Sequence, residues 1–143
     1  MPGTRMSRYE IFIGTWNTTG EVHAVADAPA SRMSATDTYR WMPGRHFILH
    51  DADARMGETV ARSTEIIGYD DKARKFLARA FDDQGGYEAF EVELRGKHWS
   101  IRGQTVRFNG KFDRAGNKLA GLWEMKSGRA RWQPWIELQL DRA

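Results

Sequence analysis

The sequence predicts an all-β fold, an antiparallel up-and-down β-barrel of about ten strands with a short N-terminal helix. Runs rich in Val, Ile, Thr and aromatic residues recur roughly every 8–12 residues along the chain. Gly, Asp and Asn separate these runs in turns too short for the crossover that parallel strands need. The 143 residues fit one domain, 1–143, with the barrel at about 12–140. A sheet this long tends to close, because closure removes its exposed edges.

A helix of one or two turns is expected before the first strand. Ser7 and Glu10 have the spacing of a capping box, and Gly14 is suited to end the helix.

The first strand is expected at residues 14–25, where Thr, Val and Trp suit a pleated chain. A looser stretch with Pro and small residues follows at 26–35. In 71–81, Ala73, Phe76, Leu77 and Ala80 also lie at helical spacing, but the turn residues on both sides favour a strand. The remaining strands are expected at 36–41, 46–54, 60–69, 75–81, 87–94, 98–103, 105–112, 118–125 and 135–140.

Composition excludes several classes of function. The chain has no cysteine, so disulfides, thiolate metal sites and a cysteine nucleophile are excluded. Its 22 basic and 19 acidic residues are interspersed without a run of five like charges, so the basic balance alone does not indicate nucleic-acid binding. The N-terminus lacks an apolar stretch of signal-peptide length, and no run is long enough to span a membrane. We therefore expect a cytoplasmic protein that binds neither nucleic acid nor membranes.

Several short motifs, in this order and spacing, resemble the DUF1579 family of bacterial proteins. They are Gly14, Trp16, TDTYRWMPGRHFILH (36–50), RMGE (55–58), EIIGYD (65–70), FDDQG (81–85) and RFNGKFD (107–113). The resemblance implies a lipocalin-like, calycin-type barrel with a helix closing one end, and it implies no activity. The Gly14-Thr15-Trp16 triplet is similar to the Gly-x-Trp that opens lipocalins and fatty-acid-binding proteins, whose Trp packs across the closed end.

Haem-binding nitrobindins have a similar barrel and ligate iron through a histidine late in the chain. The last histidine here is His98, so we expect no haem and no other cofactor.

The segment HDAD (50–53) places a histidine beside two aspartates. In a strand, His46, Ile48, His50, Ala52 and Ala54 share one face, and Phe47, Leu49, Asp51 and Asp53 share the other. His50 and the aspartates then point apart, so no metal site is expected. If His50 points inward, it needs a hydrogen-bond partner from a neighbouring strand, a ligand, or a role as a catalytic base.

Other strands carry polar or aromatic residues that can share the interior with His50. Because a ligand-binding barrel can be partly polar inside, inside and outside are not fixed at several strands, and each charge also fits a solvated surface. Trp123, Trp132 and Trp135 are read mainly as packing residues, with ligand stacking as the alternative. The residues predicted to line a cavity are Tyr39, His50, Glu65, Arg107, Glu124 and Trp135.

Three functions remain open. The first is a barrel that binds a small apolar or aromatic molecule. The second is an enzyme with an acid–base couple of His50 and Glu65, which requires these side chains within hydrogen-bond reach. No nucleophile motif or phosphate loop supports other chemistry. The third is a solid barrel that acts as a structural or interaction protein, for instance as a homodimer.

Overall fold

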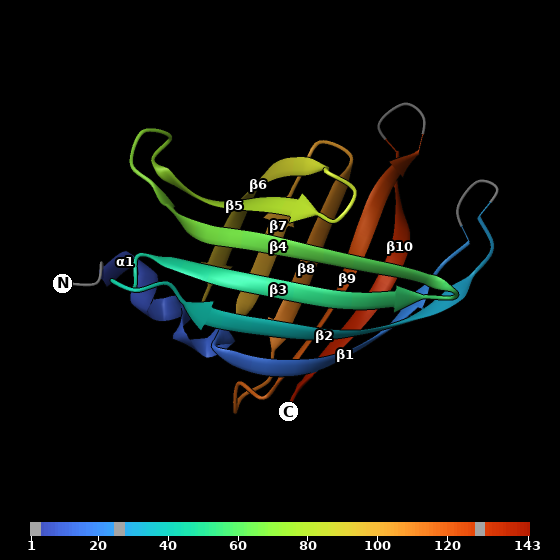
Figure 1. Cartoon of the computed structure of the whole chain (residues 1–143), viewed down its shortest axis with the longest axis horizontal. Coiled ribbons are helices and arrows are strands. Elements are labelled where there is room, and N and C mark those ends of the chain that lie inside the picture. Colours follow the sequence, from blue (N-terminus) through green and yellow to red (C-terminus); the bar gives the residue numbers. More distant parts are fainter. Residues whose placement is uncertain (1–3, 25–27, 128–130) are drawn as a thin grey trace.

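The computed structural model describes residues 4–24, 28–127 and 131–143, and in them a closed antiparallel barrel of ten strands (Figure 1). Each strand pairs with its neighbours in the chain, and β1 pairs with β10 to close the ring. The elements are α1 (Thr4–Ser7), the 3-10 helix η1 (Arg8–Phe12), β1 (Gly14–Val22), β2 (Ser31–Trp41), β3 (Phe47–Met56), β4 (Thr59–Asp70), β5 (Lys75–Asp82), β6 (Tyr87–Arg95), β7 (His98–Arg102), β8 (Val106–Phe112), β9 (Lys118–Ser127) and β10 (Arg131–Arg142).

The predicted fold class is confirmed, with differences at the element ends. Strand β2 begins at Ser31, before the predicted 36, because the Ser- and Ala-rich residues 31–35 pair with residues 18–22 of β1. Pairing thus overrides weak strand propensity. The ambiguous segment forms β5, in which Leu77 pairs with Gly68 and Glu91. Strand β1 ends at Val22, and residue 25 of the predicted first strand lies outside the described residues.

The N-terminal helix is present, but its predicted capping box is wrong. Ser7 has helical backbone angles (φ −60, ψ −32) and makes no capping hydrogen bond through its side chain. An N-cap residue has extended angles instead. The chain leaves the helix at Ile13, which is extended, and Gly14 then takes a φ of +129° that glycine tolerates best.

Aromatic side chains fill the end of the barrel beneath the helix. The ring centroid of Phe12 lies 4.7 Å from that of Trp99 and 5.1 Å from that of Phe112. Trp16 is 1% exposed and donates a hydrogen bond from Nε1 to the Phe12 carbonyl at 2.8 Å. As the Gly-x-Trp resemblance implied, Trp16 packs across the closed end. We call Tyr9, Phe12, Trp16, Trp99 and Phe112 the closed-end cluster.

Arg142, at the end of β10, fastens this closed end. Its guanidinium lies 4.2 Å from the Trp16 ring centroid. It also donates hydrogen bonds to the carbonyls of Ile11 and Ile13, both at 2.7 Å, and of Gly116 at 2.9 Å. The side chain therefore ties the last strand to the chain that follows the helix.

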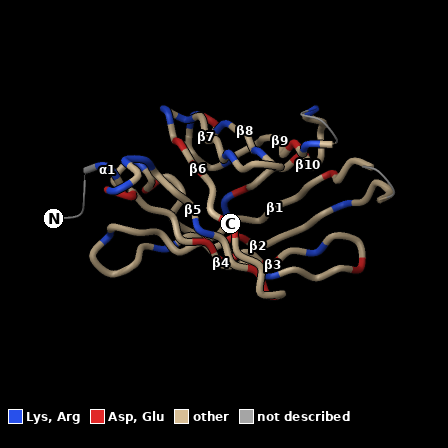
Figure 2. The backbone as a smooth tube through the Cα atoms, turned by 90° about the horizontal axis from the view of Figure 1, so that it is seen from above, with Lys and Arg blue, Asp and Glu red and all other residues tan. Residues whose placement is uncertain are grey.

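The two walls of the interior differ in chemistry. Figure 2 shows β6–β10 on one side of the barrel and β2–β5 on the other. On the β6–β10 side, large apolar residues point inward, such as Val92, Ile101 and Phe108, which are all less than 9% exposed. Phe108 covers the paired glycines Gly110 and Gly121, where a Cβ on Gly110 would come within 2.7 Å of its ring. This wall is densely packed.

The β2–β5 wall is arranged in rows of directly opposite residues. The row nearest the closed end is apolar, and its Ile48, Ile67 and Ala78 are 0% exposed. The next rows are polar and then small, in the order Tyr39–His50–Glu65–Ala80, Asp37–Ala52–Ser63–Asp82 and Ala35–Ala54–Ala61. The small residues of the last two rows are inward yet only partly buried, so accessible space lies beside them.

Candidate functional site

His50 is held between two carboxylates inside the barrel. Its Nε2 lies 2.7 Å from Asp37 Oδ1, and its Nδ1 lies 3.0 Å from Glu65 Oε1. The other Asp37 oxygen, Oδ2, accepts a hydrogen bond from the Thr18 hydroxyl. The Tyr39 ring stacks on the imidazole with centroids 3.9 Å apart and planes 8° from parallel. These five residues, from strands β1 to β4, form what we call the polar cluster.

Strand register brings the cluster together. The fully buried Ile48 marks the inward face of β3, and His50, two residues on, shares that face. Tyr39 and Glu65 are the residues directly opposite His50 on its two neighbouring strands. Asp37 lies two residues from Tyr39 on β2, within diagonal reach of His50. The cluster thus combines a row of three residues with Asp37 from the next row and with Thr18, which lies opposite Ala35.

The cluster is largely withdrawn from water. The side chains of His50, Asp37 and Glu65 are 15%, 10% and 15% exposed. Burial by itself would lower the pKa of His50, but hydrogen bonds to Asp37 and Glu65 and their negative charges outweigh it and raise the pKa to about 10. His50 is therefore an imidazolium at neutral pH. One cation between two carboxylates leaves the cluster with one net negative charge.

Two polar atoms of the cluster are unpartnered and not fully buried. Neither Glu65 Oε2 nor the Tyr39 hydroxyl has a hydrogen-bond partner among the residues that the structure describes. In those residues, the one side-chain polar atom that is both fully buried and unpartnered is the Tyr9 hydroxyl. Both cluster atoms therefore reach accessible space. Because Tyr39 and Glu65 share the inward face with His50, this residual exposure lies on the inner side of the barrel wall.

The cluster limits the chemistry available. Both nitrogens of His50 are engaged and the raised pKa keeps its proton in place, so it cannot serve as a general base at neutral pH. The condition for an acid–base couple, a short contact between His50 and Glu65, is met. Any base would have to be a carboxylate. Within the described ranges, no group of three or more His, Asp or Glu side chains is arranged to hold a metal ion.

The other predicted cavity residues lie elsewhere. Arg107 and Glu124 are cross-strand partners whose side chains pair at 2.8 Å. They point outward, because Phe108 and Trp123, next to them in β8 and β9, pack inward against each other. Arg107 also lies 4.2 Å from the Trp132 ring centroid on this outer surface.

Trp135 lies at an irregularity in the pairing of β10 with β9. The pairing register of the two strands shifts between Pro134 and Ile136. The ring of Trp135 meets that of Trp123 edge to face, with centroids 6.4 Å apart. Trp135 is therefore in contact with an inward residue, and in the described part of the chain its ring does not stack on the Tyr39 or His50 ring of the polar cluster.

Sequence reasoning missed Asp37 and Thr18 as site residues. Asp37 had a usable signal, since it shares a face with Tyr39 in β2. Thr18 had none, because one inward Thr in a Thr-rich strand is unremarkable by sequence. The reading of HDAD is confirmed: Asp51 and Asp53 point outward, with side chains 49% and 47% exposed.

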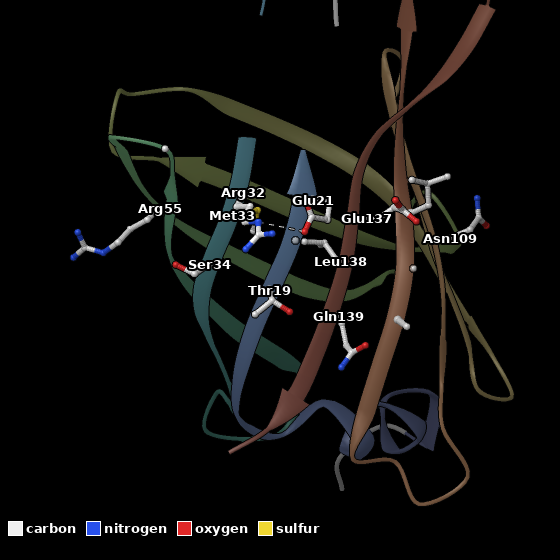
Figure 3. A pocket seen from close by; sticks show the side chains of 15 residues that line it. Thr19, Glu21, Arg32, Met33, Ser34, Arg55, Asn109, Glu137, Leu138 and Gln139 are labelled. Carbon is white, nitrogen blue, oxygen red and sulfur yellow. Dashed lines mark ion pairs between the residues drawn. The ribbon is translucent and has the colours of Figure 1, made fainter. Parts of the chain in front are cut away.

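A separate groove of about 1080 Å³ runs over the outer face of the barrel (Figure 3). Figure 3 shows Thr19, Glu137 and Gln139 along it, and the ion pair of Arg32 with Glu21 at 3.6 Å. No residue of the polar cluster lines it. The groove is thus a different surface from the interior site.

Comparisons with known proteins place the chain by family and fold. The family model described as "Protein of unknown function (DUF1579)" matches residues 3–137. No curated protein matches the chain. The crystal structure of Rv2717c from M. tuberculosis is similar, with a TM-score of 0.72 and 11% identity over 100% of this chain and 99% of that one. At that identity the likeness shows the fold alone. None of the helices in the described residues could cross a membrane, since each is too short. Since the family model spans nearly the whole sequence, this chain belongs to the DUF1579 family.

Proposed function

We propose that this protein is a binding barrel that holds a small molecule with an apolar or aromatic body in its interior. The observation that carries the proposal is the pair of unpartnered atoms, Glu65 Oε2 and the Tyr39 hydroxyl, which face interior space. Polar atoms withdrawn from bulk water are normally paired, because an unmade hydrogen bond costs free energy. A ligand or ordered water must complete them.

The surroundings of these atoms suit a mostly apolar ligand. The rows beyond the cluster carry Ala52, Ala54 and Ala61, whose small side chains leave room. The opposite wall presents apolar and aromatic residues such as Phe90 and Phe108. A site with apolar walls and a few convergent polar groups is the usual form of a small-molecule pocket.

Binding is favoured over catalysis by the state of His50. An acid–base couple needs a group that can give and take a proton at working pH, and His50 is locked between two acceptors with its pKa raised to about 10. His50 instead positions Glu65 and Asp37. A solid barrel is disfavoured because a filled interior would not leave polar atoms accessible there.

The test uses N-phenyl-1-naphthylamine, an uncharged dye whose fluorescence rises in apolar sites. We expect saturable binding by the wild-type protein and a loss of binding in Ala54→Trp, which places a bulky ring in the small-residue row. The matched control is Ala89→Trp, on the exposed outward side of β6, which should bind as the wild type does. Equal binding by both variants, or none by the wild type, would refute an interior site.

A further inference from the structure

The polar wall of the barrel is acidic, and His50 is the one cation in it. All Lys and Arg residues of strands β1–β4 lie on the outward faces of these strands, and they are Arg32, Arg40, Arg55 and Arg62. His50 has to serve both Asp37 and Glu65. A molecule that enters this space therefore meets an uncompensated negative charge.

The acidic character continues along the row of opposite residues that holds His50 and Glu65. Ala80 of β5 lies directly opposite Glu65 on one side and Glu88 of β6 on the other. Neighbouring strands are about 4.8 Å apart, so the two glutamates start about 10 Å from each other with only a methyl group between them. Glu88 is exposed. The gap over Ala80 is thus bordered by two carboxylates.

The unpartnered atoms specify what kind of group fits beside them. Glu65 Oε2 can only accept hydrogen bonds as a carboxylate oxygen. The Tyr39 side chain is buried among the cluster, and its hydroxyl can also accept one. A carboxylate or phosphate of a ligand would place like charges together, whereas an ammonium group would donate to such acceptors and neutralise the cluster.

We propose that the ligand of this barrel is an aromatic alkylamine bound as its ammonium ion, with the nitrogen at Glu65 Oε2 and the Tyr39 hydroxyl and the ring against the apolar wall. This inference rests on the proposed binding function and narrows it to a charge class. A neutral alcohol could make one of the same hydrogen bonds, but it would leave the charge of the cluster unbalanced.

The test compares three probes that share one ring system and differ in charge: tryptamine, indole-3-ethanol and indole-3-acetate. Isothermal titration calorimetry at neutral pH and low salt should show tryptamine binding about tenfold tighter than the alcohol, because charge-assisted hydrogen bonds are roughly twice as strong as neutral ones. The acetate should bind most weakly of the three. This comparison needs only the wild-type protein, so it does not depend on the folding of a variant.

Two variants test whether Glu65 causes the preference for tryptamine. Glu65→Gln keeps an oxygen that can accept from His50 but removes the charge, so tryptamine should lose its advantage over indole-3-ethanol. Glu124→Gln is the matched control, since Glu124 points outward beside Arg107, and it should leave all three affinities unchanged. Circular dichroism verifies that each variant is folded.

The outcomes separate the two proposals. If the naphthylamine dye binds but the alcohol or the acetate equals or exceeds tryptamine, the amine inference is wrong and the binding function stands. If the dye and all three indoles fail to bind, both are wrong. An equal loss of tryptamine binding in Glu65→Gln and Glu124→Gln would also overturn the inference, because it would place the charge effect outside the barrel.

Discussion

The closed-end cluster and the polar cluster occupy the same barrel and share strand β1, but they are built on opposite principles. Trp16 of β1 belongs to the first and Thr18 of β1 to the second. The closed end buries Phe12 and Trp16 almost completely, and its ring centroids lie 4.7–6.1 Å apart. The polar cluster buries charges and keeps two hydrogen-bonding atoms unpartnered.

This difference separates stability from function. Apolar side chains contribute free energy in proportion to the area they remove from water, so the closed end stabilises the fold. Burying an ion pair brings little or no net stability, because desolvation offsets the attraction. A protein that keeps such a cluster gives up stability at that place, which is expected where a site must stay reactive or open.

The largest loss of stability is expected at the closed end. Phe12→Ala removes a ring in contact with Tyr9, Tyr39, Trp99 and Phe112 and should lower the free energy of unfolding by about 3–5 kcal/mol. Chemical denaturation measures the change. Phe81→Ala is the control, since Phe81 is 43% exposed on the outer face and its loss should cost under about 1 kcal/mol. Similar losses in both variants would show that the closed end is not the stabilising core.

Removing the cation of the polar cluster should have the next largest effect. His50→Gln leaves Asp37 and Glu65 close together without their shared cation, so we expect the free energy of unfolding to fall by about 3 kcal/mol at neutral pH. The triple variant Asp37→Asn, His50→Gln, Glu65→Gln should recover most of this loss, because no charge is buried in it. It should nevertheless lose the preference for tryptamine. A triple variant that stays as unstable as the single one would mean that the cluster supports the fold.

The contribution of His50 to the free energy of unfolding should depend on pH. Its pKa in the folded protein, about 10, lies above the ordinary 6.5, so the folded state holds the proton more tightly than the unfolded chain does. The resulting stability is fully present below pH 6.5 and is lost as the pH rises through about 10. The stability difference between wild type and His50→Gln should therefore shrink across that range in thermal melts. A difference that does not change with pH would show that His50 is neutral in the folded state.

The smallest effect is expected on the outer face. Arg107→Ala breaks the ion pair with Glu124 and the contact with Trp132, and it should cost about 0.5–1 kcal/mol. Binding of the naphthylamine dye should not change, because this side chain points away from the interior. A clear loss of dye binding would contradict the outward placement of Arg107 and support its predicted position in the cavity.

Much of the architecture was predictable from the sequence because hairpin turns punctuate it regularly. Runs of β-branched and aromatic residues between Gly and Asp turns identified every strand. Period-two alternation grouped His50 with Ile48 on one face of its strand and Glu65 with Ile67 on one face of the next.

The rest of the site could not be derived, because alternation groups residues into faces without saying which face is inside. In β8, Phe108 and Phe112 form an apolar face and Arg107 the polar one. A polar interior would have turned Arg107 inward, and only the packing of Phe108 on Trp123 shows that it points outward. The partnership of His50 with Asp37 is diagonal between strands and depends on register, which local sequence does not encode.

The seam between β1 and β10 has a consequence for biosynthesis. The closed ring of strands joins β1 to β10, from opposite ends of the described chain. Arg142 of β10 adds hydrogen bonds to the carbonyls of Ile11 and Ile13. During translation, one edge of β1 has no strand to pair with until β10 leaves the ribosome, and contacts so distant in sequence form slowly. A nascent chain thus carries an open β-edge for most of its synthesis, and such an edge invites aggregation. A ribosome stalled before β10 should therefore display a chaperone substrate rather than a nearly finished barrel.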